Sequence, residues 1–160
     1  MIGPDEFRRV LGHFATGVTI VTTCDGDARP SGLTVSAFAS LSLDPPLVLV
    51  CVDHKSQTYP ALRESGHFAV NVLTAGQEAL SRRFASTQLD KFDGLAYRIS
   101  ELGLPLLAAA LAHLECVTLS THVAGDHTIF VGRVERAGVD AGEPLLYYCG
   151  RYSRLGEGQV

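Results

Sequence analysis

The chain has 160 residues and a formal net charge of -4, and 46% of its residues are hydrophobic while 19% are charged. This length and balance suit one packed domain, which we expect to span residues 1–160. The 13 lysines and arginines form no basic block, and no apolar run reaches the roughly 20 residues that a membrane helix needs. Nucleic acid and membrane are therefore disfavoured as partners. Because the start lacks a secretory signal, we expect a cytoplasmic protein.

The cysteines and histidines show no metal-site spacing. The four cysteines stand far apart without a C-x-x-C pair, and the six histidines form no H-E-x-x-H motif. We interpret the cysteines as free thiols rather than as disulfides or metal ligands, and we expect no metal. The glycine-rich dinucleotide fingerprint, the phosphate loop of nucleotide hydrolases and the G-x-S-x-G motif of serine hydrolases are also absent, which disfavours those three classes.

The first predicted elements are a helix and a hairpin. Residues 4–14 predict an amphipathic helix, and residues 17–38 contain two strand-like runs joined by the turn segment DGDARP. The run LVLVCVD at 47–53 then predicts a strand buried on both faces. The apolar side chains of the helix recur at helical spacing and are Phe7, Val10, Leu11 and Phe14.

Two helices follow, with a strand between them. Ser56 is the predicted N-cap of a helix in the segment 56–65. The alternating segment 67–73 predicts a strand. Thr74 and Gln77 have the spacing of a capping box, so we expect a further helix directly after them.

The rest of the chain is rich in strands. Residues 85–94 are polar and are expected to form a mobile loop. Three more strands, separated by turns that contain glycine, are predicted at 114–125, 127–138 and 144–150. Six or more strands with only short helices predict a mainly β, antiparallel barrel rather than an alternating parallel sheet.

The stretch GLTVSAFASLSLDPP at 32–46 places small and hydroxyl side chains around Phe38. One interpretation is a strand with a bulge, in which small side chains let another backbone approach. The other is a ligand site, because Thr34, Ser36 and exposed main-chain groups would suit the edge of a flat heteroaromatic ring. The residues alone leave both interpretations open.

Three shorter segments also have two interpretations each. HKSQT at 54–58 lies where a strand ends and a helix begins, so it is either an ordinary cap or an anion site. Arg82 and Arg83 beside Phe84 form either a solvated helix end or a contact for a phosphate and a ring. His127 follows a glycine and an aspartate at a strand entrance, where a histidine is more often incidental than functional.

Taken together, eight segments resemble the flavin reductase family with the FMN-binding split barrel, the small reductase components of two-component flavin monooxygenases. They are FATGVTIVTT, GLTVSAFASLSLDPPLVLV, KSQT, HFAVNVL, SRRF with DKFDG, PLL with LECV, GDHTIFVGRV and PLLYYCGRY, in the order of that family across about residues 6–155. The resemblance implies an antiparallel Greek-key split β-barrel with short flanking helices. It also implies a homodimer with flavin in a groove near the interface.

The resemblance further implies which residues bind the ligands. The isoalloxazine would contact Gly32, Leu33, Thr34, Ser36 and Ala37. The ribityl and phosphate groups would contact Cys51, Val52, Asp53, Ser56, Gln57 and Thr58, with Arg83 and Phe84 closing the other side. The nicotinamide would be oriented by His127, the catalytic residue, beside Tyr147, Tyr148, Cys149, Gly150 and Tyr152.

The implied activity is that of an NAD(P)H:flavin oxidoreductase. It would reduce FMN or FAD with NADH or NADPH and release the reduced flavin by diffusion to a separate monooxygenase. Because few basic residues lie near these segments, we expect flavin to be a weakly held, exchangeable substrate. Two alternatives stay open: a pyridoxamine-phosphate-type oxidase on the same fold, and a flavin carrier or sensor without turnover.

Overall fold

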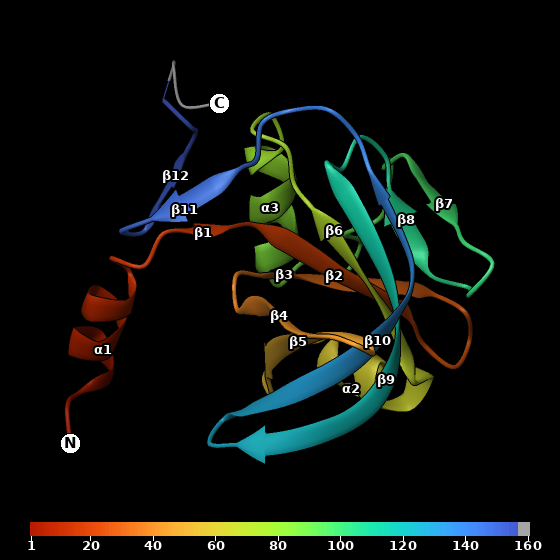
Figure 1. Cartoon of the computed structure of the whole chain (residues 1–160), viewed down its shortest axis with the longest axis horizontal. Coiled ribbons are helices and arrows are strands. Elements are labelled where there is room, and N and C mark those ends of the chain that lie inside the picture. Colours follow the sequence, from red (N-terminus) through yellow and green to blue (C-terminus); the bar gives the residue numbers. More distant parts are fainter. Residues whose placement is uncertain (157–160) are drawn as a thin grey trace.

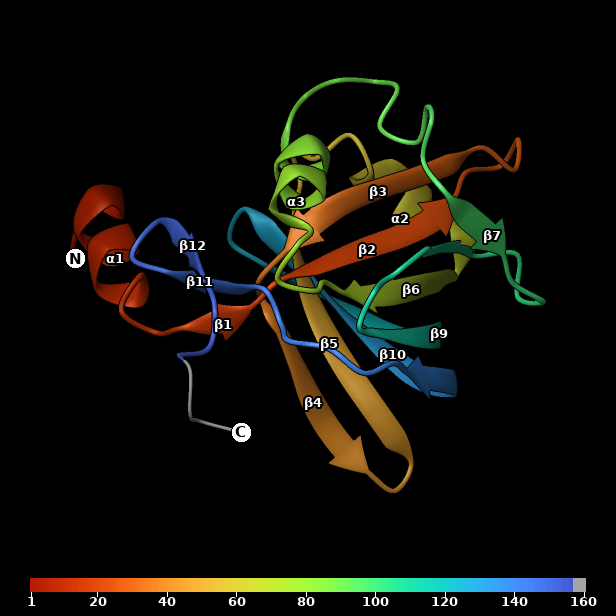
Figure 2. The same cartoon turned by 90° about the horizontal axis from the view of Figure 1, so that it is seen from above.

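The computed structural model of the chain describes residues 1–156, and twelve strands and three short helices lie within that range. Figures 1 and 2 show most of the strands wrapped into a barrel, with the N-terminal helix standing away from it. The helices are α1 (Pro4–Leu11), α2 (Tyr59–Ser65) and α3 (Glu78–Ala85). The strands are β1 (Thr16–Gly17), β2 (Thr19–Cys24), β3 (Pro30–Val35), β4 (Phe38–Leu43), β5 (Pro46–Asp53), β6 (His67–Val72), β7 (Tyr97–Ile99), β8 (Pro105–Leu107), β9 (Ala112–Ala124), β10 (His127–Val139), β11 (Leu146–Tyr148) and β12 (Arg151–Ser153).

The pairing of the largest sheet explains the barrel. Its seven strands lie in the order β3-β2-β6-β9-β10-β5-β4, and every pair is antiparallel. The two edge strands are neighbours in sequence, because β3 ends at Val35 and β4 begins at Phe38. Three residue steps span at most roughly 10 Å, so the sheet has to curl until its edges meet. The predicted mainly β, antiparallel Greek-key split barrel is confirmed.

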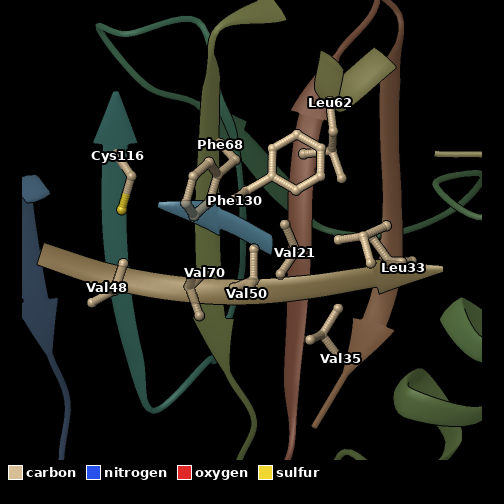
Figure 3. Packing of buried hydrophobic residues seen from close by; sticks show 11 residues of the cluster. Val21, Leu33, Val35, Val48, Val50, Leu62, Phe68, Val70, Cys116 and Phe130 are labelled. Carbon is tan, nitrogen blue, oxygen red and sulfur yellow. The ribbon is translucent and has the colours of Figure 1, made fainter. Parts of the chain in front are cut away.

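The barrel interior is filled by aromatic and branched side chains. Phe68 and Phe130 are fully buried and pack with Val21 and Val50, and Leu62 of α2 closes one end of the cluster. Figure 3 shows these side chains meeting from β2, β5, β6, β10 and α2. Such packing of neighbouring strands provides most of the apolar burial that holds the barrel closed.

Strand β5 corrects one prediction. Its burial alternates, so that Val48, Val50 and Val52 are buried while Leu49 and Cys51 between them are half-buried. A strand buried on both faces would show no such alternation. The prediction of two buried faces was therefore wrong, and the second face of β5 lies on the outside of the barrel.

The other predicted strands are present. The hairpin expected at 17–38 forms from β2 and β3, which pair from Thr19 with Val35 to Cys24 with Pro30. The strands expected at 67–73, 114–125 and 127–138 correspond to β6, β9 and β10. Strands β7, β8 and β12 were not predicted, because runs of three residues are too short to show a period.

The predicted helix starts are partly correct. Helix α2 begins at Tyr59 with Thr58 as its N-cap, whereas Ser56 Oγ accepts the N–H of Thr58 at 3.2 Å in the preceding turn. Ser56 is thus a turn residue, and its prediction as the N-cap was wrong. One of the two hydrogen bonds of the predicted capping box is present: the N–H of Thr74 donates to Gln77 Oε1 at 2.9 Å.

The polar segment after α3 is tied to the barrel rather than free. Lys91 is only 8% exposed, and its Nζ donates to the carbonyl oxygens of Phe84 at 3.1 Å and of Gly32 at 3.4 Å. The ring of Phe92 packs edge-on against Phe84, with 5.1 Å between the centroids. The expectation of a mobile loop at 85–94 overlooked these anchors, which become visible only in three dimensions.

Residues 1–156 contain neither a membrane-spanning helix nor a cluster of metal ligands. None of the helices there is long and apolar enough to cross a membrane. No three His, Cys, Asp or Glu side chains in that range are grouped so that they could hold a metal ion. All four cysteines are free thiols, as predicted.

Candidate functional site

The small-residue stretch contains a break between two strands. Ser36 and Ala37 separate β3 from β4, and both are exposed. The N–H of Cys51 donates to the carbonyl oxygen of Ala37 at 3.0 Å, which holds the break against β5. A bulge also occurs in β4, between Ser40 and Ser42. Both interpretations of the stretch therefore apply, since it contains a bulge and also exposes main chain that a flat ligand can approach.

Three adjoining clefts form a groove along this break. The first cleft measures about 300 Å³ and lies between the β5–α2 turn and the loop after α3. The second measures about 200 Å³ and shares Thr34 and Ala85 with the first. The third measures about 450 Å³, is mostly apolar, and shares Ser36 and Tyr147 with the second. The groove thus runs from a polar end beside β5 to an aromatic end beside β11.

At the polar end four backbone N–H groups are already occupied. The N–H groups of Lys55 and Ser56 donate to Asp53, to its Oδ1 at 2.8 Å and to its carbonyl oxygen at 3.0 Å. The N–H groups of Thr58 and Tyr59 both donate to Ser56. These four N–H groups are therefore engaged within the turn and are not free to bind an anion.

Thr34 and Gly32 line clefts, and both also contact α3. The hydroxyl of Thr34 donates to the carbonyl oxygen of Ser81 at 2.6 Å, so towards a ligand this hydroxyl can only accept. Gly32 is buried, and a Cβ there would lie 2.8 Å from the ring of Phe84. The missing side chain lets α3 pack closely on β3, and this packing places Phe84 in the wall of the first cleft.

The aromatic end is built on two tyrosines that α3 holds in place. The rings of Tyr147 and Tyr152 meet edge-to-face with 5.2 Å between centroids. The hydroxyl groups of Tyr152 and Ser81 are hydrogen-bonded at 2.8 Å, and the guanidinium of Arg82 lies 4.8 Å from the Tyr152 ring centre. Arg82 is itself paired with Glu78 at 2.7 Å. Its charge is therefore already partnered, and its role here is to steady the tyrosine.

His127 lies beside the polar end but not in the groove lining. It stands opposite Asp53 in the register of β10 with β5, and its Nδ1 is 2.7 Å from Asp126 Oδ1. This hydrogen bond is the main reason that the pKa of Asp126 is lowered. Because Nδ1 faces a carboxylate, the neutral ring carries its proton there and keeps Nε2 as an acceptor. The side chain is 43% exposed, so a ligand can reach the ring.

The structure brings many of the predicted site residues together. Ten line the groove: Leu33, Thr34, Ser36, Asp53, Ser56, Gln57, Phe84, Tyr147, Gly150 and Tyr152. Two more, Gly32 and Thr58, line a smaller neighbouring cleft. The others lie outside these linings and are Ala37, Cys51, Val52, Arg83, His127, Tyr148 and Cys149.

Two of the outlying residues have clear structural duties. The side chain of Val52 is 0% exposed and belongs to the core. Arg83 donates to the carbonyl oxygens of Asp90 and Asp93, so it ties down the loop after α3. Conversely, the linings include Ser86, Thr87 and Lys91, which were not among the predicted site residues. A polar loop in a sequence gives no sign of which of its residues turn inward.

The split barrel and its groove are those expected for the flavin reductase class, and comparison with known proteins gives the same class. The family described as "Flavin reductase like domain" matches residues 11–156. The match covers most of the chain, and this chain belongs to that family.

Similar proteins include several reductases. The reductase subunit HsaB of a flavin-dependent monooxygenase from Mycobacterium tuberculosis is 46% identical over 157 residues, which covers 96% of this chain and 83% of that protein. FMN reductase (NADH) SmoA from Agrobacterium fabrum is 46% identical over 150 residues, with 94% and 85% covered. A solved structure of an NADH:FAD oxidoreductase from Streptomyces globisporus, in complex with NAD and FAD fragments, has 41% identity and a TM-score of 0.92, covering 100% of this chain and 99% of that chain.

Proposed function

We propose that this protein is an NAD(P)H:flavin oxidoreductase that reduces FMN or FAD by hydride transfer and supplies the reduced flavin to a separate monooxygenase. The observation that carries the proposal is the groove, which joins a polar end to an aromatic end along an exposed main-chain break. Related proteins are named as NADH-dependent reductases of FMN or FAD. NADH is therefore the expected hydride donor.

The groove suits a flavin in both shape and chemistry. The isoalloxazine is flat and carries donors and acceptors on one edge, and the small exposed residues Ser36 and Ala37 let such a ring lie against main chain. The ribityl chain and phosphate are polar, and the first cleft is lined by Ser56, Gln57 and Thr87. These features support the assignment of the ring to the break and of the phosphate end to the first cleft.

Hydride transfer makes simple demands on this chain. A bound flavin would act as the hydride acceptor, which takes two electrons and one proton from the dihydronicotinamide. The protein has to hold the two rings with their reacting atoms about 3–3.5 Å apart and keep water from between them. Tyr147 and Tyr152 offer ring edges and faces at the aromatic end. No side chain has to act as a nucleophile.

We assign His127 to the nicotinamide side as an orienting residue. Its Nε2 can accept the N–H of the carboxamide, because Asp126 holds the proton on Nδ1. In a single chain His127 shares neither of the clefts lined by Tyr147 and Tyr152. In a dimer, a second copy of the chain could place its His127 beside Tyr147 and Tyr152 across the interface.

We infer that the protein is a homodimer. Helix α1 has no buried residue in one chain, and its apolar face is uncovered. The accessible surface of the chain is 9480 Å², whereas a compact monomer of 17.1 kDa would expose about 7,700 Å². The excess is of the size that a stable dimer buries on each chain. The uncovered side chains are Phe7, Val10 and Leu11 on α1 and Phe14 shortly after it.

The partner and the cellular setting are part of the same proposal. Relatives are named as the reductase subunit or reductase component of a monooxygenase. We propose that this chain acts as one reductase domain in the cytoplasm, where NADH is produced. Reduced flavin then reaches the oxygenase by diffusion, as an exchangeable substrate.

Steady-state oxidation of NADH with excess FMN or FAD tests the proposed function. A reductase oxidises many equivalents of NADH per chain, whereas a carrier or sensor binds one flavin per site without turnover. Oxidation of pyridoxamine phosphate without NADH would instead support the oxidase alternative. The loss of bound flavin on dialysis, with activity restored by added flavin, tests whether flavin is an exchangeable substrate.

A further inference from the structure

Lys91 is a buried ammonium on the wall between two clefts. It lines both the first cleft of the groove and the smaller cleft beside Ser31 and Thr58. Its Nζ donates to two carbonyl oxygens, those of Phe84 and Gly32. An ammonium has three N–H groups, so one remains for a further acceptor.

No carboxylate balances this charge in the described chain. The ion pairs within residues 1–156 do not include Lys91. A buried charge without a counter-charge is costly, and the same burial lowers the pKa of Lys91. An anion bound in the cleft would supply the counter-charge that the Lys91 ammonium lacks.

The surroundings of Lys91 suit an oxyanion. The chain has only two lysines, Lys55 and Lys91, and both line the first cleft. Hydroxyl and amide side chains make up most of the remaining polar lining, and Asp53, the single acidic residue among the described lining residues, already accepts the N–H of Lys55. Four backbone N–H groups of the β5–α2 turn, those of Lys55, Ser56, Thr58 and Tyr59, are engaged within the turn, so a side-chain donor adds to what the backbone can offer a phosphate here.

We propose that Lys91 binds the phosphate ester of the flavin and thereby selects FMN and FAD over riboflavin. The inference rests on the proposed function, since it concerns the phosphate end of the same groove. It assigns a binding and selectivity role to a residue that the sequence placed in a polar loop. Phosphate binding also links the ligand to the loop after α3, because Lys91 lines the cleft together with Ser86 and Thr87 of that loop.

Binding measurements on Lys91→Met test the proposal, because methionine keeps the length of the side chain and removes the charge. The dissociation constants of FMN, FAD and riboflavin are measured by quenching of flavin fluorescence. We expect affinity for FMN and FAD to fall about tenfold or more, as for loss of a hydrogen bond to a charged group. Riboflavin affinity is expected to stay within about twofold. An equal loss for all three ligands, or no loss for FMN, overturns the proposal.

Lys55→Met is the matched control, because Lys55 lines the same cleft but is exposed. Because solvent screens an exposed charge, it contributes less binding energy than a buried one. We therefore expect this variant to lose less FMN affinity than Lys91→Met. If Lys55→Met carries the loss and Lys91→Met does not, the phosphate lies elsewhere in the cleft and the proposal fails.

A second measurement needs no variant of Lys91. In protein labelled with ¹³C at lysine Cε, the two lysines give two NMR signals, which Lys55→Met assigns. FMN is expected to shift the Lys91 signal, and riboflavin is expected to leave it near its original position. A Lys91 signal that ignores FMN, or that moves equally with riboflavin, overturns the proposal. Turnover of NADH by the unaltered protein is measured separately, so failure of the proposed function would be seen independently of this result.

Discussion

The backbone of Gly32 and the ring of Phe84 are in direct contact where β3 meets α3. A Cβ on residue 32 would lie 2.8 Å from Cε1 of Phe84 and 3.1 Å from the carbonyl oxygen of Val21. Phe84 is 1% exposed and has little room to retreat. The family resemblance assigned Gly32 to the flavin ring, and the structure shows that packing alone already requires a glycine there.

Gly32→Ala should therefore destabilise the protein and distort the groove wall. We expect a loss of about 1–3 kcal/mol in the free energy of unfolding, as is usual for overpacking, together with weaker flavin binding. Urea or thermal unfolding measures the first effect. Gly26→Ala is the control, because no atom lies within 4 Å of a Cβ there. Equal stability of the two variants would contradict the argument.

His127→Ala should impair the use of NADH without unfolding the protein. The side chain is 43% exposed and its side-chain partner is Asp126, so its removal opens no cavity in the core. Loss of one hydrogen bond of about 0.5–1.5 kcal/mol raises the KM for NADH about two- to tenfold. Flavin affinity and Tm should remain unchanged. His122→Ala, at an exposed position of β9, serves as control, and an early-melting His127→Ala with normal kinetics would make the histidine structural.

The hydrogen bond between Tyr152 and Ser81 should contribute to stability as a pair. Ser81 is 0% exposed, so Tyr152→Phe leaves a buried hydroxyl without its partner and should cost about 1–3 kcal/mol. The double variant Ser81→Ala with Tyr152→Phe removes both groups and should recover part of that loss. A double-mutant cycle of unfolding free energies measures the coupling. Strict additivity of the two single changes would show that the bond does not couple them.

The affinity for FMN should fall at alkaline pH, and the fall should begin at a lower pH than it would if Lys91 had the usual pKa of a lysine. Burial lowers the pKa of Lys91 below its usual value of 10.5, so its positive charge is lost as pH rises through that lowered pKa. Phosphate binding needs the charged form, and the other charged groups facing the cleft are Lys55 and Asp53. Titration of FMN and riboflavin side by side isolates the phosphate contribution. The ratio of the two affinities should decline with pH, and in Lys91→Met it should be flat.

Val10→Asp should dissociate the proposed homodimer. Val10 lies on the apolar face of α1 and is 51% exposed in one chain, so a carboxylate there is harmless in a monomer and unfavourable in an apolar interface. Light scattering should return a mass near 17.1 kDa for this variant, and about twice that for the unaltered protein. Arg9→Asp, on the polar side of the same helix, is the control. A monomeric unaltered protein with full activity would refute the dimer.

Much of the fold could be predicted because it depends on local properties of the chain. The strand-like composition of β2, β6 and β10, and the turn residues between strands, can be recognised from neighbours in sequence. The order of eight segments was enough to indicate the family and hence the groove. Val48 and its alternating partners in β5 show the limit, since an unbroken apolar run cannot reveal that one face of its strand lies outside the barrel.

The details of the site depend on contacts between residues that are far apart in sequence. Lys91 reaches the carbonyl oxygen of Gly32 across 59 positions of chain, and no local pattern predicts that a lysine in a polar loop turns inward. Arg83 donates to carbonyl groups of the loop for the same reason, because the folded loop places those groups beside it. Local sequence patterns were thus sufficient to predict the class of barrel and the segments that line the groove. Which side chains in those segments are free to bind a ligand depends on the folded chain, because a donor or a charge is available only when no neighbouring group already binds it.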